Sequence, residues 1–133
     1  MPPSSNSFRD LIVWQKAMEL ARQVYALTRR LPKEELYALG DQMRRAAVSI
    51  PSNIAEGQAR NSRKEFLNFL SIAKGSNAEL GTQLELCATL GYLSAEVAAP
   101  VAALSVEVGR MLTTLSTRLK SSLPQHPSPP SNN

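Results

Sequence analysis

The sequence predicts an all-α protein: an antiparallel up-down-up-down four-helix bundle with a disordered C-terminal tail. Three observations support this fold class. Apolar residues recur every three or four positions in four segments, and no segment shows the alternation typical of a strand. Short connections join the segments, which places consecutive helices antiparallel. Hydrophobic residues make up 43% of the chain and aromatic residues only 5%, so we expect an aliphatic core, which suits helices.

The 133 residues fit one domain. We expect a flexible N-terminus over residues 1–8, the bundle over 9–120, and a disordered tail over the Pro/Ser/Asn-rich residues 121–133. The single cysteine excludes an internal disulfide and fits a reducing compartment. No apolar run approaches the roughly 18 residues that span a bilayer. These features predict a cytoplasmic protein.

The first helix is expected at about residues 10–30, and Leu31-Pro32 ends it because proline restrains the residue before it. Two apolar series run along it and together cover about half of its circumference. The first series is Leu11, Trp14, Met18, Ala21, Tyr25 and Thr28, and the second is Val13, Ala17, Leu20, Val24, Leu27 and Leu31. A helix packed on one side needs a narrower stripe, so we expect burial on two sides, within the bundle and against another subunit.

The second helix is expected at about residues 35–57, with Gly57 as its C-terminal glycine. Pro51 lies inside the apolar pattern and should kink the helix there. The third helix is expected at about residues 62–91, where Ser62 and Glu65 have the spacing of a capping box. The fourth is expected at about 94–120 behind a capping serine, although a proline at position 100 leaves its start open.

The segment Gln42–Gly57 stands out because it combines a doubled arginine, a proline and several short polar side chains. On a helical wheel its apolar residues occupy one arc. A polar stripe occupies an adjacent arc of about 100° and contains Gln42, Arg45, Ser49, Ser52, Asn53, Glu56 and Arg60. Arg44 points away from this stripe, so the two neighbouring arginines serve different surfaces. This makes Arg44 the better candidate for an outside partner.

Three stretches around this segment resemble a known family. They are FRDLIVWQKA at 8–17, LPKEELYALGDQMRRAAVSIPSNIAEG at 31–57 and SRKEFLNFLSIAKGSNAELGTQL at 62–84, followed by LGYL at 90–93. In these the chain is similar to the bacterial four-helix bundle proteins also called 23S rRNA intervening-sequence proteins. The accessory variability determinant proteins of diversity-generating retroelements resemble the same family. Departures are Leu31, where an aromatic residue is usual, and Pro100.

The resemblance implies a homo-oligomer, typically a ring of five bundles. It also implies that nucleic acid or a reverse transcriptase is a partner of some relatives, and that no enzymatic activity belongs to the family. The charge distribution is compatible with nucleic acid, because residues 1–64 hold eleven Lys/Arg against six Asp/Glu.

Two sets of candidate residues follow. A basic patch for phosphates would consist of Arg44, Arg45, Arg60, Arg63 and Lys64. An interface or buried polar network would consist of Trp14, Gln42, Arg45, Ser49, Asn53, Glu56 and Glu79. Arg45 belongs to both sets, since its guanidinium suits either a phosphate or an ion pair with Glu56 or Glu79 inside the assembly.

Catalytic and metal-binding patterns are absent from the sequence. The one histidine, His126, lies in the expected tail, which leaves the bundle without a Ser–His or Cys–His pair or a His-based metal site. We therefore expect no catalytic residue, no metal and no cofactor. The predicted function is a non-enzymatic, homo-oligomeric binding or scaffold module. Besides itself, its favoured partner is RNA or DNA, and a nucleic-acid-processing protein is the further candidate. The alternative is a protein-binding adaptor without nucleic-acid contact.

Overall fold

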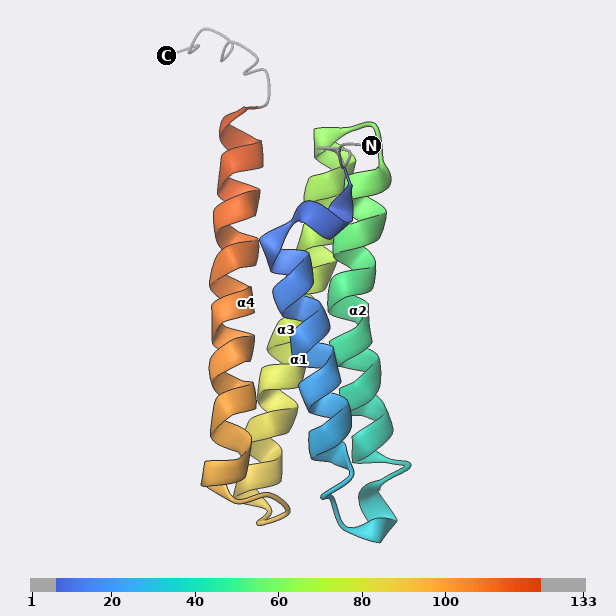
Figure 1. Ribbon diagram of the computed structural model, residues 1–133, viewed down its shortest axis with the longest axis vertical. Helices are drawn as coiled ribbons and strands as arrows, with labels where there is room; N and C mark the ends of the chain where they lie inside the picture. Colours follow the sequence, from blue (N-terminus) through green and yellow to red (C-terminus); the bar gives the residue numbers. More distant parts are fainter. Residues whose placement is uncertain (1–6, 123–133) are drawn as a thin grey trace, which may run out of the picture.

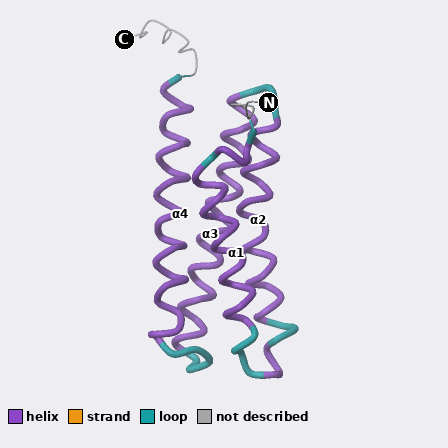
Figure 2. Tube along the Cα trace, in the orientation of Figure 1, coloured by secondary structure: helices purple, strands orange, loops and turns teal. Residues whose placement is uncertain are grey.

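The computed structural model describes residues 7–122, which form four antiparallel helices in up-down-up-down order (Figure 1). These are α1 (Ile12–Thr28), α2 (Leu39–Ala59), α3 (Arg63–Thr89) and α4 (Ala95–Ser121). Two short 3-10 helices, η1 (Phe8–Asp10) and η2 (Lys33–Glu35), precede α1 and α2, and Figure 2 shows no strand in this part of the chain. The predicted all-α bundle is confirmed. Of the tail predicted over 121–133, Ser121 still belongs to α4 and Ser122 follows it as the C-cap. The rest of the predicted tail and the N-terminal residues 1–6 lie outside the described residues.

Two helix starts are capped as the spacing predicts. The Ser62 hydroxyl accepts a hydrogen bond from the Glu65 backbone N–H, and the Ser94 hydroxyl accepts one from the Val97 N–H. Pro100 lies in the second turn of α4 without displacing its start from Ala95. At the opposite end of α3, Gly91 has a φ of 74°, the left-handed conformation that favours glycine after a helix.

The structure differs from the expectation for the second helix at both ends. Of its first expected residues, Glu35 is the last residue of η2 and 36–38 form a turn, so α2 begins only at Leu39. Gly57 is a buried residue inside α2 rather than a residue that ends it. A Cβ there would lie 2.7 Å from Cβ of Phe69 and 2.9 Å from Cδ1 of Phe66. Gly57 therefore permits the close approach of α2 and α3.

The core lies along the bundle axis, because each helix packs on two neighbours: α1 and α3 each contact both α2 and α4. The largest fully buried apolar side chains come from all four helices and are Leu20, Met43, Ile50, Ile54, Leu70, Leu80 and Leu112. Pro51 is also buried. This cyclic order puts the α1/α2 side of the molecule opposite the α3/α4 side.

Only one of the two apolar stripes of α1 is fully covered within this chain. The stripe that includes Leu20 and Val24 is buried, whereas Met18 and Tyr25 of the other stripe remain 46% and 45% exposed. The second half of the expected two-sided burial thus depends on a contact outside the chain and stays a prediction.

Candidate nucleic-acid interface at one end of the bundle

Basic side chains from four separate elements meet at one end of the bundle. The alternating direction of the helices brings the end of α2, the start of α3 and the end of α4 together, with η1 nearby (Figure 1). We call this surface the basic end, and it consists of Arg9, Arg60, Arg63, Lys64, Arg118 and Lys120. All six residues are exposed. Only Arg60, Arg63 and Lys64 belong to the patch predicted from the sequence.

Some of these side chains are held by local contacts. Arg63 Nη1 donates a hydrogen bond of 3.0 Å to the carbonyl oxygen of Ser122, which joins the start of α3 to the end of α4. The Arg9 guanidinium lies over the Phe8 ring at 4.6 Å, and Phe8 packs edge-on against Trp14 with ring centroids 5.2 Å apart. The surface is therefore partly ordered before any partner arrives.

The charge at this end is unbalanced. Its nearby carboxylates are Asp10, Glu56 and Glu65, three against the six basic groups. Of these three carboxylates, only Glu56 forms an ion pair with a described residue, Arg60, at 2.9 Å. The side chains of Lys64, Arg118 and Lys120 form no ion pair within residues 7–122. By contrast, the connection over residues 29–41 at the opposite end carries three basic and three acidic residues.

Arg44 faces into the bundle instead of toward an outside partner. Its guanidinium donates to Thr28 Oγ1 at 2.9 Å and to the Leu36 carbonyl oxygen at 2.7 Å, and it pairs with Asp41. The side chain is only 20% exposed. Arg44 therefore joins the end of α1, the following connection and the start of α2. Because these contacts occupy its guanidinium, Arg44 is not part of a phosphate-binding surface.

Arg45 is exposed and forms no ion pair within the described residues, including none with Glu56 or Glu79. It lies in the second turn of α2. At 1.5 Å per residue it is about 22 Å along the axis from Arg60. The basic patch predicted from the sequence is thus divided between the two ends of the bundle.

The predicted polar network is smaller than expected and includes a residue that sequence reasoning missed. The hydroxyls of Ser49 and Ser76 are 2.8 Å apart and link α2 to α3. Asn53 Nδ2 donates to the Ser49 carbonyl oxygen at 2.8 Å and to its hydroxyl at 2.9 Å. Within residues 7–122 the other members do not join them: Gln42 and Glu79 are exposed, and Glu79 accepts a bond there only from Gln83 on its own helix.

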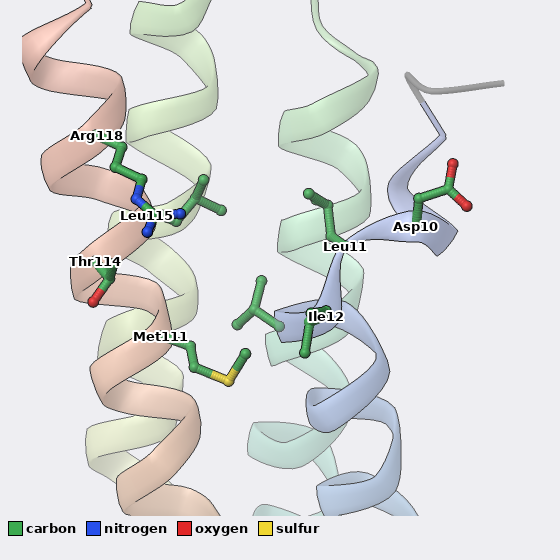
Figure 3. Close-up of a pocket in the computed structure, with 8 residues that line it drawn as sticks. Asp10, Leu11, Ile12, Met111, Thr114, Leu115 and Arg118 are labelled. Carbon is green, nitrogen blue, oxygen red and sulfur yellow. The ribbon is translucent and has the colours of Figure 1, made fainter.

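A cleft of about 360 Å³ adjoins the basic end between the start of α1 and the end of α4. Its walls are mainly apolar and include Leu11, Ile12, Met111 and Leu115. Figure 3 shows Arg118 on the α4 wall, while the Asp10 carboxylate on the other side is directed away from it. The cleft offers an apolar surface with one cation at its rim and has no cluster of ionisable groups.

Residues 7–122 show no features of a metal site, a reactive thiol or a membrane-spanning helix. No group of three or more His, Cys, Asp or Glu side chains is placed to hold a metal. Burial raises the pKa of the Cys87 thiol, which opposes formation of a reactive thiolate. Within the same residues no helix has the length and hydropathy needed to cross a bilayer.

Sequence reasoning missed Arg9, Arg118 and Lys120 because they lie far from the doubled arginine along the chain. The signal was nevertheless present. In an up-down-up-down bundle the end of the second helix, the start of the third and the end of the fourth share one end, and each carries basic residues.

Fold and surface together define the class: a small antiparallel four-helix bundle with one basic end. The chain belongs to the 23S rRNA-intervening sequence protein family, whose model matches residues 9–114. A similar solved structure is a protein of unknown function from the S23 ribosomal protein family of Bacteroides thetaiotaomicron. Its sequence is 27% identical to that of this chain, and the two structures superpose with a TM-score of 0.74. The match covers 79% of this chain and 98% of the other. No curated protein matches this chain.

Proposed function

We propose that this protein is a non-enzymatic, homo-oligomeric binding module that binds nucleic acid through its basic end. The observation that carries the proposal is the gathering of six exposed Lys/Arg residues from four elements, with only three carboxylates among them. Such a surface attracts phosphates and releases their counterions on binding. The name of the family, which refers to an intervening sequence of 23S rRNA, supports RNA as the first probe.

The chemistry of the surface favours contact with the phosphate backbone over the reading of bases. Arginine presents a planar fork of donors that matches phosphate oxygens, and lysine adds a mobile point charge. Neither Phe8 nor Phe69 is a free stacking platform, because the Arg9 and Arg60 guanidinium groups lie over their rings. We therefore expect affinity for RNA or DNA with little dependence on sequence.

The homo-oligomeric part of the proposal is supported by the incompletely covered α1. Met18 and Tyr25 on this helix and Val48 on α2 are each more than 40% exposed. Large apolar side chains that share one face favour a protein contact there. The family resemblance suggests five copies, and light scattering on the purified chain measures the number.

Nucleic-acid binding is tested with labelled RNA at low ionic strength by fluorescence anisotropy. The variant K64E/R118E/K120E is expected to lose most binding. Its matched control is R29E/R30E/K33E, which makes the same change in net charge at the other end of the bundle and is expected to retain binding. Absence of RNA and DNA binding by the unmodified protein would exclude the proposed partner and leave the protein-binding adaptor as the function to test.

A further inference from the structure

We infer that the partner on the α1/α2 face is a second copy of this chain, which contributes its opposite, α3/α4 face. Neighbouring copies would then lie side by side, each contact joining two different faces. The inference rests on the proposed homo-oligomer and specifies which two surfaces meet. Neither the fold nor the basic end depends on it.

The α1/α2 face presents large side chains. Trp14, Met18 and Pro51 line a shallow cleft of about 360 Å³ between the two helices. Tyr25 and Val48 extend this surface toward the end of α1 and are 45% and 41% exposed. The face can therefore supply several projecting apolar groups to a neighbour.

The α3/α4 face has the complementary shape. A groove of about 300 Å³ runs between these helices, and most of its lining side chains are small. These small residues are Gly81, Ala88, Ala95, Ala98, Ala99 and Ala102. Val106 at one side is 54% exposed. A groove lined by alanines leaves room for large side chains from outside and has few of its own to fill it.

The large side chains of one face and the small side chains of the other lie at similar distances along the bundle axis. The end of α1, the start of α2, the end of α3 and the start of α4 share one end of the molecule (Figure 1). Measured from there at 1.5 Å per residue, Tyr25 lies at about 5 Å and Val48 at about 14 Å. On the opposite face Ala99 lies at about 6 Å and Gly81 at about 12 Å. Two copies side by side with parallel axes thus place large groups opposite small ones.

Charge supports the same pairing. Arg45 lines the α1/α2 face beside Tyr25 and Val48, and Glu85 lines the α3/α4 groove. Both are exposed, and neither forms an ion pair within residues 7–122. Their levels are about 9 Å and 6 Å from the shared end. Arg45 of one copy would therefore face Glu85 of the next.

The pairing joins two different surfaces, so it is heterologous. Each copy retains one unused face after the first contact, so further copies add in the same sense. The assembly is a ring if the rotation between neighbouring copies closes and an open filament if it does not. A contact of two α1/α2 faces would instead be isologous and would stop at a dimer. This distinction makes the inference testable with two single variants.

The experiment is light scattering on V48E, which blocks the α1/α2 face, and A99E, which blocks the groove. Each variant alone is expected to be a monomer of 14.5 kDa at micromolar concentration. Mixed together they are expected to form a 1:1 dimer, because A99E keeps an intact α1/α2 face and V48E keeps an intact groove. The control I72E, at a residue 52% exposed on another side of α3, should retain the wild-type mass. Circular dichroism checks that all variants are folded.

A charge swap gives an independent readout. R45E and E85R should each weaken the assembly, and the double variant R45E/E85R should restore it. If the wild-type chain is a monomer, both the homo-oligomer and the inference are overturned. If the wild-type chain is an oligomer but A99E leaves its mass unchanged, or the mixed variants form no dimer, the inference alone is overturned.

Discussion

Asn77 and Ser105 exchange two hydrogen bonds across the buried contact between α3 and α4. Asn77 Nδ2 donates to the Ser105 carbonyl oxygen at 2.9 Å, and the Ser105 hydroxyl donates to Asn77 Oδ1 at 2.8 Å. Gly109 makes room for the amide, since a Cβ there would lie 3.0 Å from Nδ2. A reciprocal polar pair buried between two helices specifies how the helices align.

Replacing Ser105 with alanine should therefore destabilise the bundle. The substitution leaves Asn77 Oδ1 without a partner in a buried position, which costs about 1–3 kcal/mol. Urea unfolding followed by circular dichroism measures the change. Ser71→Ala, at an exposed position of the neighbouring helix α3, is the control and should change stability by less than about 0.5 kcal/mol. Equal effects of the two substitutions would contradict a structural role for the pair.

Two glycine-to-alanine substitutions should change the stability of the bundle in opposite directions. Gly57→Ala brings a methyl group within 2.7 Å of Phe69 Cβ and should destabilise by about 1–3 kcal/mol. Gly75→Ala meets no atom within 4 Å inside α3 and should stabilise by about 0.5–1 kcal/mol through helix propensity. Thermal and urea unfolding measure the stability of both variants. Stabilisation by Gly57→Ala would show that α2 and α3 do not approach as described.

The neighbouring arginines should also separate in their effects on stability. Arg44→Ala removes a half-buried group that serves Thr28, the Leu36 carbonyl and Asp41, and should cost about 1.5–3 kcal/mol. Arg45→Ala removes an exposed side chain without an ion pair in the described residues and should cost less than about 0.5 kcal/mol in the monomer. Urea unfolding of both variants in the V48E background, which is expected to be monomeric, excludes the loss of subunit contacts. A larger loss for Arg45→Ala there would mean that the roles are reversed.

The buried thiol predicts a loss of stability at alkaline pH. Burial, and secondarily the charge of Glu35, raise the pKa of Cys87 in the folded protein. The stabilisation is complete below the unfolded thiol's pKa of about 8.5 and is lost as pH rises through the folded value. Urea unfolding between pH 7 and 9.5 should show this decline, and Cys87→Ala should flatten it. A decline unchanged in Cys87→Ala would assign it to another group.

The fold was predictable from the sequence because helix periodicity and caps are local properties. Ser62 and Ser94 cap their helices within a few residues, as their spacing indicates. What escaped prediction depends on tertiary packing. The burial of Gly57 follows from the positions of Phe66 and Phe69 on the next helix. A helical wheel shows the direction of each side chain but not which neighbour is within reach.

In the candidate site, too, the contacts that sequence patterns did not predict are those that depend on tertiary packing. The helical wheel separates Arg44 from Arg45 and favours Arg44 for an outside partner, yet Arg44 is the one that finds acceptors on α1 and on the preceding connection. Ser76 joins Ser49 only because α2 and α3 place the two hydroxyls 2.8 Å apart. The residues of the basic end likewise become one surface only through the antiparallel order of the helices.

The salt dependence of RNA binding tests the central claim most directly. For the wild-type protein, log affinity should fall linearly with log salt concentration as phosphate-bound counterions are released. The variant K64E/R118E/K120E should bind weakly and reduce the slope by about 2–3, one unit for each lost phosphate contact. R29E/R30E/K33E should keep the wild-type slope. No binding by the wild-type protein, or equal losses in the two variants, would contradict a nucleic-acid interface at the basic end.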